Sequence, residues 1–138
     1  MAEKTSIWAE RVAAPDGHYP QALKLGDQLF VSGLVATDPE GRLQGGGDPA
    51  AESRQILRNL TELMTAASAQ MTHVMKVTLY LVDLADEKAY DAASREFFFF
   101  QPPVRTVVQV AALPKGARVL LDAHAVVPAP DPLSKAMI

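Results

Sequence analysis

Apolar and polar residues alternate over short stretches in the first third of the chain, a period of two that is typical of β-strands with one buried face. Residues 6–13, 22–25 and 28–32 are predicted to be strands on this basis. Gly26-Asp27 lies between the last two, and glycine readily adopts the positive φ that a tight hairpin turn requires. A long polar loop over residues 37–47 then leads to the next element.

From residue 48 onward the pattern changes to the period of an α-helix. Asp48 is predicted to cap the N-terminus of this helix and Pro49 to occupy its first turn. Apolar side chains fall on one helical face and polar ones largely on the other; the first set is Ile56, Leu57, Leu60, Leu63, Met64 and Ala67, the second Glu52, Arg54, Arg58, Asn59 and Glu62. The apolar face is predicted to pack on a sheet.

Strand-like and helix-like segments alternate in the second half of the chain. Residues 74–82 are rich in β-branched and large apolar side chains and are predicted to be a central strand. Residues 87–98 are predicted to be a second helix that the proline pair 102–103 ends, because proline lacks a backbone donor and restricts the residue before it. Residues 105–111 and 118–127 are predicted to be two further strands.

This order of elements, ββ(β)αβαββ, predicts an α+β fold in which both helices cover one face of a mostly antiparallel or mixed sheet. The 138 residues, 49% of them hydrophobic, suffice for one core, so we expect a single domain over residues 1–138 with an irregular tail over 128–138. The other sheet face also carries apolar residues, and such a face is usually buried in an oligomer. The phenylalanines at 97–100 wrap a full turn, so at least one ring must face away from the core or cover another subunit.

Composition narrows the classes of partner. A net charge of −3, from 13 basic and 16 acidic residues, argues against a nucleic-acid partner. The chain has no cysteine, and its three histidines (His18, His73, His124) lack the spacing of a known zinc motif, so neither a disulfide nor a metal is predicted. No segment has the roughly 20 apolar residues that span a bilayer, and no signal peptide is evident, so a cytoplasmic protein without membrane contact is expected.

Arg105 is the strongest candidate for chemistry, because it is one cation within the apolar, strand-like run QPPVRTVVQVAALPK. Alternation places it on the face opposite Val104 and Val108, and an unpaired buried guanidinium is very costly. Its side chain therefore either points to solvent or meets an anion, and a rigidly held guanidinium suits bidentate capture of a carboxylate. Ser32 and the glycines at 45–47 lack the flanking patterns of a nucleophile turn and of a phosphate loop.

Six segments together resemble, in the same order, the RidA/YjgF family of reactive-intermediate deaminases, some members of which are called L-PSP endoribonucleases. The resemblance covers about nine-tenths of the chain, through GHYPQA (17–22), LFVSGLVATDPEG (29–41), SRQILRNL (53–60), VTLYLVDLAD (77–86), YDAASREFF (90–98) and PPVRTVVQVAALPKGARVLLDAHAV (102–126). It implies a chorismate-mutase-like fold, a homotrimer with a central barrel of sheets, and no cofactor. Ribonuclease activity is the least expected of the candidate functions, because the net charge of the chain is negative.

The resemblance also implies a site between subunits. A carboxylic-acid substrate binds the arginine that matches Arg105, and an activated water attacks the C=N carbon of an imine and releases ammonia. Tyr19 and Ser32 match the pocket tyrosine and serine of the family and are expected to orient ligand or water. Val107 stands where the family has a cysteine, and Asp91 where it has an asparagine on the second helix.

The last strand departs from the family at one functional position. The glutamate that helps to hold the attacking water in deaminating members is Leu120 here. Asp122 and His124 share a strand face with Leu120 and are candidate replacements for the lost acid or base, as are His18 and Asp91.

Three functions remain open from the sequence. The first is an imine or enamine deaminase, a hydrolase acting on C=N bonds. The second is a non-deaminating member that binds a small carboxylate. The third is a pathway enzyme for an aminomuconate-like or other aromatic-derived acid, which only the phenylalanine run supports. The substrate is not specified by the sequence.

Overall fold

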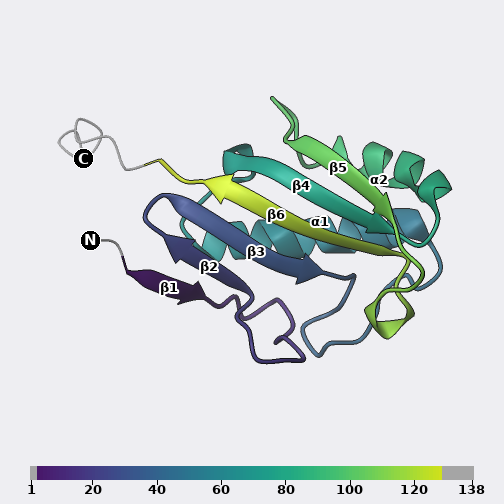
Figure 1. Ribbon diagram of the computed structural model, residues 1–138, viewed down its shortest axis with the longest axis horizontal. Helices are drawn as coiled ribbons and strands as arrows, with labels where there is room; N and C mark the ends of the chain where they lie inside the picture. The colour runs from purple at the N-terminus through teal and green to yellow at the C-terminus, as the bar shows by residue number, and fades with distance from the viewer. Residues whose placement is uncertain (1–2, 129–138) are drawn as a thin grey trace.

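The computed structural model describes residues 3–128, which form a six-stranded sheet with both α-helices on one face (Figure 1). The sheet order is β1-β2-β3-β6-β4-β5. The strands are β1 (Lys4–Ile7), β2 (Ala22–Leu25), β3 (Gln28–Leu34), β4 (Val74–Leu81), β5 (Val104–Gln109) and β6 (Val119–Val126). β4 and β5 pair in parallel, and the other neighbouring strands pair antiparallel. The predicted α+β fold is therefore confirmed, while the predicted tail lies, beyond residue 128, outside the described residues.

Helix α1 (Pro49–Ala66) begins as the sequence predicts. The Asp48 carboxylate accepts hydrogen bonds from the backbone N–H groups of Ala50 and Ala51, which otherwise lack helical partners. The apolar face of α1 packs against β3 and β6 and supplies much of the core, through Ile56, Leu57, Leu60, Leu63 and Met64. Helix α2 (Glu87–Ser94) packs beside α1 and buries Tyr90 and Ala93.

Two polar residues of α1 that were predicted to face solvent are buried instead. Glu52 has no exposed surface, and its carboxylate accepts backbone N–H groups of Gly47 (3.2 Å), Arg118 (2.9 Å) and Val119 (3.2 Å). Asn59 is 3% exposed and donates to the carbonyl of Thr37. The helical period predicted that both residues face solvent. Instead, loop and strand backbone covers them, and the buried backbone N–H and C=O groups there form hydrogen bonds with these two side chains.

The first predicted strand is displaced. β1 spans Lys4–Ile7, whereas residues 8–13 of the predicted strand 6–13 are not in a strand and turn at residues 10–11. The Gln21 side chain holds this turn: its Oε1 accepts the Ala9 N–H at 2.6 Å, and its Nε2 donates to the carbonyls of Val12 (2.9 Å) and Ala13 (3.1 Å). The buried side-chain amide of Gln21, the residue just before β2, therefore overrides the strand-like alternation of residues 9–13.

The second helix is shorter than predicted, and the proline pair does not end it. α2 ends at Ser94, and the Ser94 carbonyl accepts the N–H groups of both Phe97 (3.1 Å) and Phe98 (2.9 Å) in a turn that leaves the helix. Phe98 is buried, whereas Phe99 is 84% and Phe100 71% exposed. The expectation that part of this aromatic run points away from the core is confirmed.

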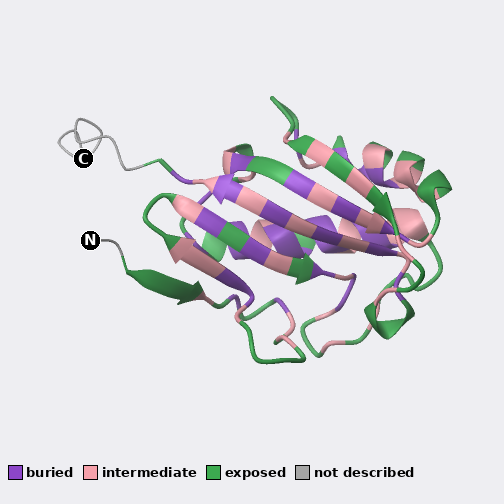
Figure 2. Cartoon of the chain, in the orientation of Figure 1, coloured by how far each residue is buried: buried purple, intermediate pink, exposed green. Residues whose placement is uncertain are grey.

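The sheet face opposite the helices, here called the outer face, is open to solvent in the single chain (Figure 2). Along β6, residues alternate between fully buried side chains on the helix side and partly exposed ones on the outer face. Phe30, Val104 and Val108 expose apolar surface on the outer face. Among residues 3–128, no helix is both long and apolar enough to cross a membrane.

Candidate functional site

Arg105 lies on β5, at the edge of the sheet, and points toward the helices. It is the register partner of Val77 and, one strand further, of Ala123, both of which are buried under the helices. Its side chain is 25% exposed. Of the two alternatives that the sequence left for this cation, the structure shows the second: Arg105 meets anions rather than bulk solvent.

Both anions come from α2. Arg105 Nη1 lies 3.2 Å from Glu87 Oε2, and Nη2 lies 3.1 Å from Asp91 Oδ1. The guanidinium carbon is 4.9 Å from the centroid of the Tyr90 ring, a cation–π distance. Glu87, Tyr90, Asp91 and Arg105 are called the arginine cluster below. They fix the guanidinium in place, and a carboxylate ligand must share it with them.

The charge states in the arginine cluster follow from these contacts. Hydrogen bonds from Arg95 and then from Arg105 hold the pKa of Asp91 below its ordinary value of 3.8, so this carboxylate is anionic at neutral pH. Burial raises the pKa of Tyr90 to about 12, so the phenol stays neutral. Two hollows flank Arg105, one of about 370 Å³ bordered by Leu84, Glu87 and Lys88, the other of about 450 Å³ bordered by Ser94, Arg95, Phe98, Phe99 and Pro102.

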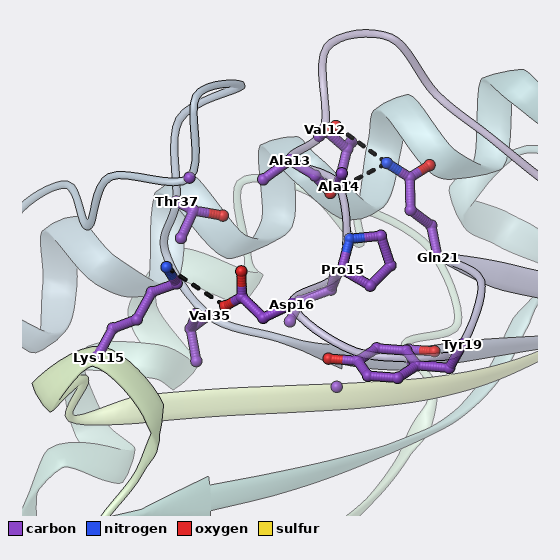
Figure 3. A pocket seen from close by; sticks show the side chains of 14 residues that line it. Val12, Ala13, Ala14, Pro15, Asp16, Tyr19, Gln21, Val35, Thr37 and Lys115 are labelled. Atoms are coloured by element: carbon purple, nitrogen blue, oxygen red, sulfur yellow. Dashed lines mark hydrogen bonds and ion pairs between the residues drawn. The ribbon is translucent and has the colours of Figure 1, made fainter.

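Tyr19 and Ser32 line a separate hollow of about 80 Å³, here called the tyrosine pocket (Figure 3). An ion pair of 3.3 Å between Asp16 and Lys115 bridges two loops across it. The Ser32 hydroxyl donates to the Pro20 carbonyl at 2.8 Å and thereby holds the loop that carries Tyr19. Tyr19 itself is 50% exposed, so its phenol is available to a ligand.

Leu120 packs beside this pocket, so the pocket has an apolar side chain where the family has a carboxylate. A methyl group built on Gly33, which lines the pocket, would lie 2.9 Å from Leu120 Cδ2, so the two residues are in close contact. The absence of a side chain at Gly33 thus leaves room for the Leu120 side chain. The position of the family's glutamate is apolar and occupied.

Asp122 and His124 lie on the outer face and have partners there. The Tyr80 hydroxyl donates to Asp122 Oδ2 at 3.3 Å, and the negative charge of Asp122 raises the pKa of Tyr80. The His124 ring stacks on Phe30 with centroids 4.6 Å apart, and its Nε2 lies 2.6 Å from Gln28 Oε1. Both side chains point away from the face that carries Arg105.

The predicted site residues thus do not converge on one point within a single chain. Arg105, Val107 and Asp91 lie on the helix side at β5 and α2. Ser32 lies on β3, three strand spacings or about 14 Å across the sheet from β5, and Tyr19 lies in the loop before β2. Ser32 alternates with Phe30 and therefore belongs to the outer face, as do Asp122 and His124. No group of three or more potential ligand side chains within residues 3–128 is placed to hold a metal ion.

Sequence reasoning missed Glu87 as a member of the site. A signal was present, because Glu87 and Asp91 are four residues apart on a predicted helix and therefore share one helical face. A prediction that Asp91 contacts Arg105 would therefore have implied that Glu87 lies near Arg105 as well.

Comparisons with known proteins agree with this fold and these motifs. A family model described as Endoribonuclease L-PSP matches residues 10–127. The 2-iminobutanoate/2-iminopropanoate deaminase of Rattus norvegicus is 38% identical over 121 residues, which are 87% of this chain and 88% of the relative.

Solved structures superpose closely. RidA from the Antarctic bacterium Psychrobacter sp. has a TM-score of 0.84 at 31% identity and covers 89% of this chain and 99% of its own. TdcF of E. coli, solved with bound serine, has a TM-score of 0.84 at 29% identity and covers 90% of this chain and 99% of its own. The chain belongs to the RidA/YjgF family, whose family model carries the description endoribonuclease L-PSP.

Proposed function

We propose that this protein hydrolyses small carboxylated imines or their enamine tautomers to 2-oxo acids and ammonia. The observation that carries the proposal is Arg105, whose side chain is three-quarters buried and whose guanidinium is held by residues of α2, in a chain similar to 2-iminobutanoate/2-iminopropanoate deaminases. A guanidinium in a fixed orientation binds a carboxylate with two parallel hydrogen bonds, which fixes the adjacent C=N carbon as well.

The chemistry needs a water and a proton acceptor rather than a redox group. Water adds to the C=N carbon of the iminium, forming a C–O bond while the C=N π electrons move to nitrogen. One proton of the added water then passes to nitrogen. The C–N bond breaks as the hydroxyl oxygen forms the C=O bond and gives its remaining proton to the departing ammonia, so the products are a 2-oxo acid and ammonium. In this proposal Arg105 holds the carboxylate through these steps, and Tyr19 orients the water or the nitrogen. No cofactor takes part in this proposal.

We further propose that the complete site forms between subunits of a homotrimer. The separation of the arginine cluster from the tyrosine pocket supports this arrangement, because one chain does not bring the two together. The exposed apolar residues of the outer face support it too, since a second copy would remove them from water. In such an assembly the tyrosine pocket of one subunit faces the arginine cluster of the next.

Introducing a charge on the outer face tests the assembly. Phe30 is 47% exposed in the single chain and would be buried in the trimer. Phe30→Glu would bury a carboxylate there, so we expect the variant to dissociate toward monomers while the wild type is a trimer. Analytical ultracentrifugation measures the change. Thr65→Glu is the control: it adds the same charge at an exposed position of α1, on the helix side of the sheet, and the trimer should persist. A wild-type monomer, or a Phe30→Glu trimer, would contradict the proposed interface.

The deamination itself is tested by ammonia release from 2-iminopropanoate, which an amino-acid oxidase generates from alanine in the same cuvette. Acceleration over spontaneous hydrolysis supports the proposal. No acceleration in a folded, oligomeric protein contradicts it.

A second candidate is a non-deaminating member that binds a carboxylate ligand without turnover. The contact between Leu120 and Gly33 favours it, because a family carboxylate is replaced there by a methyl-bearing side chain. Binding of pyruvate without acceleration of 2-iminopropanoate hydrolysis would distinguish this candidate from the first.

Leu120→Glu tests the contribution of the missing carboxylate. A positioned general base contributes about 10²–10⁴-fold, so we expect Leu120→Glu to raise the rate of 2-iminopropanoate hydrolysis by roughly 100-fold. Leu120→Gln has a similar size without basicity and should leave the rate near wild type. A folded Leu120→Glu protein with the wild-type rate would mean that another group activates the water.

A further inference from the structure

Glu87 has one ion-pair partner among the described residues, and that partner is Arg105. Its Oε2 lies 3.2 Å from Arg105 Nη1, and its side chain is 42% exposed. Asp91, by contrast, is shared: its Oδ1 faces Arg105 Nη2 at 3.1 Å while its Oδ2 lies 3.1 Å from Arg95 Nη2. The two acids that hold the guanidinium are therefore not equivalent.

A carboxylate ligand that binds Arg105 must compete with these acids. Asp91 keeps a cationic partner in Arg95 even if its contact with Arg105 lengthens. Glu87 loses its recorded partner when the ligand takes the Nη1 edge, and its negative charge then lies close to that of the ligand. This repulsion weakens the binding of a ligand that carries no charge besides its carboxylate. It weakens the binding of a dicarboxylate still more.

The position of Glu87 gives the ligand a way to remove this penalty. Glu87, Asp91 and Arg105 border one hollow of about 370 Å³, together with Leu84, Ala85 and Lys88. A ligand held by its carboxylate at Arg105 would have room to extend along this hollow. If the displaced Glu87 carboxylate turns into this hollow, a cationic group on the ligand meets it there.

We propose that Glu87 is a specificity-determining residue that selects ligands with a cationic side chain, such as the 2-imino or 2-oxo acid of arginine. The inference rests on the proposed function only in placing the ligand carboxylate at Arg105. Its chemistry is an exchange of partners: the ligand carboxylate replaces Glu87 on Arg105, and the ligand cation replaces Arg105 on Glu87. Charge balance is then the same before and after binding.

Lys88 is the competing explanation, because it borders the same hollow and forms no ion pair within residues 3–128. If Lys88 accepted the displaced Glu87, a cationic ligand would gain nothing. Lys88→Met removes this competitor and keeps the length of the side chain, so its effect on selectivity distinguishes the two accounts.

The test compares two ligands that differ in charge alone. 5-Guanidino-2-oxopentanoate and 5-ureido-2-oxopentanoate, the 2-oxo acids of arginine and citrulline, share the carboxylate, the carbonyl and the chain length. Titration calorimetry on the full-length protein should show the guanidino acid binding roughly fivefold more tightly, the magnitude of an exposed ion pair. Glu87→Gln should bring the ratio to about one, mainly by tightening the ureido acid.

Glu96→Gln is the matched control, because it removes one negative charge from an exposed glutamate that pairs with Arg54 away from this hollow. It should leave the ratio at its wild-type value. Equal affinities of the wild type for both acids would overturn the proposal, and so would a preference that survives Glu87→Gln. A preference for the guanidino acid that appears only in Lys88→Met would mean that Lys88, rather than the ligand cation, pairs with the displaced Glu87 in the wild type.

These outcomes are separable from those of the proposed function. Binding of the stable 2-oxo acids requires no turnover, so charge selection is measured even in a protein that deaminates nothing. Conversely, a wild type that accelerates 2-iminopropanoate hydrolysis but binds both 2-oxo acids equally keeps its activity and loses the selectivity proposed here.

Discussion

Arg105→Ala reduces the acceleration of 2-iminopropanoate hydrolysis about 100-fold or more, the expected result of removing a partly buried charge that anchors the substrate. The reason is geometric as well as electrostatic, because the guanidinium is fixed by Glu87, Asp91 and the Tyr90 ring before any ligand arrives. Without it, the imine carbon loses its fixed position relative to the attacking water. Ammonia release under single-turnover and steady-state conditions measures both the rate and the KM.

Two further variants give this prediction its controls. Arg105→Lys keeps a cation and loses the planar fork, so we expect an intermediate rate with a raised KM. Arg54→Ala removes an exposed arginine that pairs with Glu96 at 2.8 Å, and its activity should equal wild type. Arg105→Ala also leaves Glu87 and Asp91 without this cation, so a thermal melt must show that the variant is folded. Wild-type turnover in folded Arg105→Ala would remove the anchor role.

Glu52→Gln lowers the free energy of unfolding by about 2–3 kcal/mol, because a fully buried carboxylate that accepts three backbone N–H groups loses its charge and one acceptor. The amide NH₂ of glutamine must face one of these N–H donors, either that of Gly47 or those of Arg118 and Val119. The loop before α1 and the start of β6 therefore lose their common attachment. Urea unfolding at a fixed chain concentration measures the change.

Glu62→Gln is the comparison for Glu52→Gln within the same helix. Glu62 is 40% exposed and its contact with Arg11 is 4.0 Å long, so its loss should cost less than about 0.5 kcal/mol. If both variants unfolded at the same urea concentration, the carboxylate of Glu52 would not be the attachment that the geometry indicates.

Much of the fold was predictable because its signals are local. The Asp48 cap, the apolar face of α1 and the alternation along β6 each depend on residues a few positions apart, and each is found where the sequence predicts it. The errors have long-range causes. Gln21 binds the backbone of residues 9–13 and converts half of a predicted strand into a turn, and the backbone of residues 118–119 buries Glu52.

The candidate site shows the same division. Alternation along β5 correctly predicted that Arg105 shares neither face nor surroundings with Val104 and Val108. The identity of its anionic partners was not readable, because Glu87 belongs to a separate helix 18 residues away. Leu120 was recognised as a departure from the family, but its contact with Gly33 depends on the pairing of β3 with β6.

The sequence by itself determined the family, the α+β order of elements and the identity of the residues in question, because motifs, periods and caps are properties of neighbouring positions along the chain. Only the tertiary structure decided which of these residues meet. It placed Arg105 between two carboxylates on the helix side, set Ser32 about 14 Å away across the sheet, and turned Asp122 and His124 to the outer face. Strand order and register set these separations, and both arise from contacts between segments far apart in the chain.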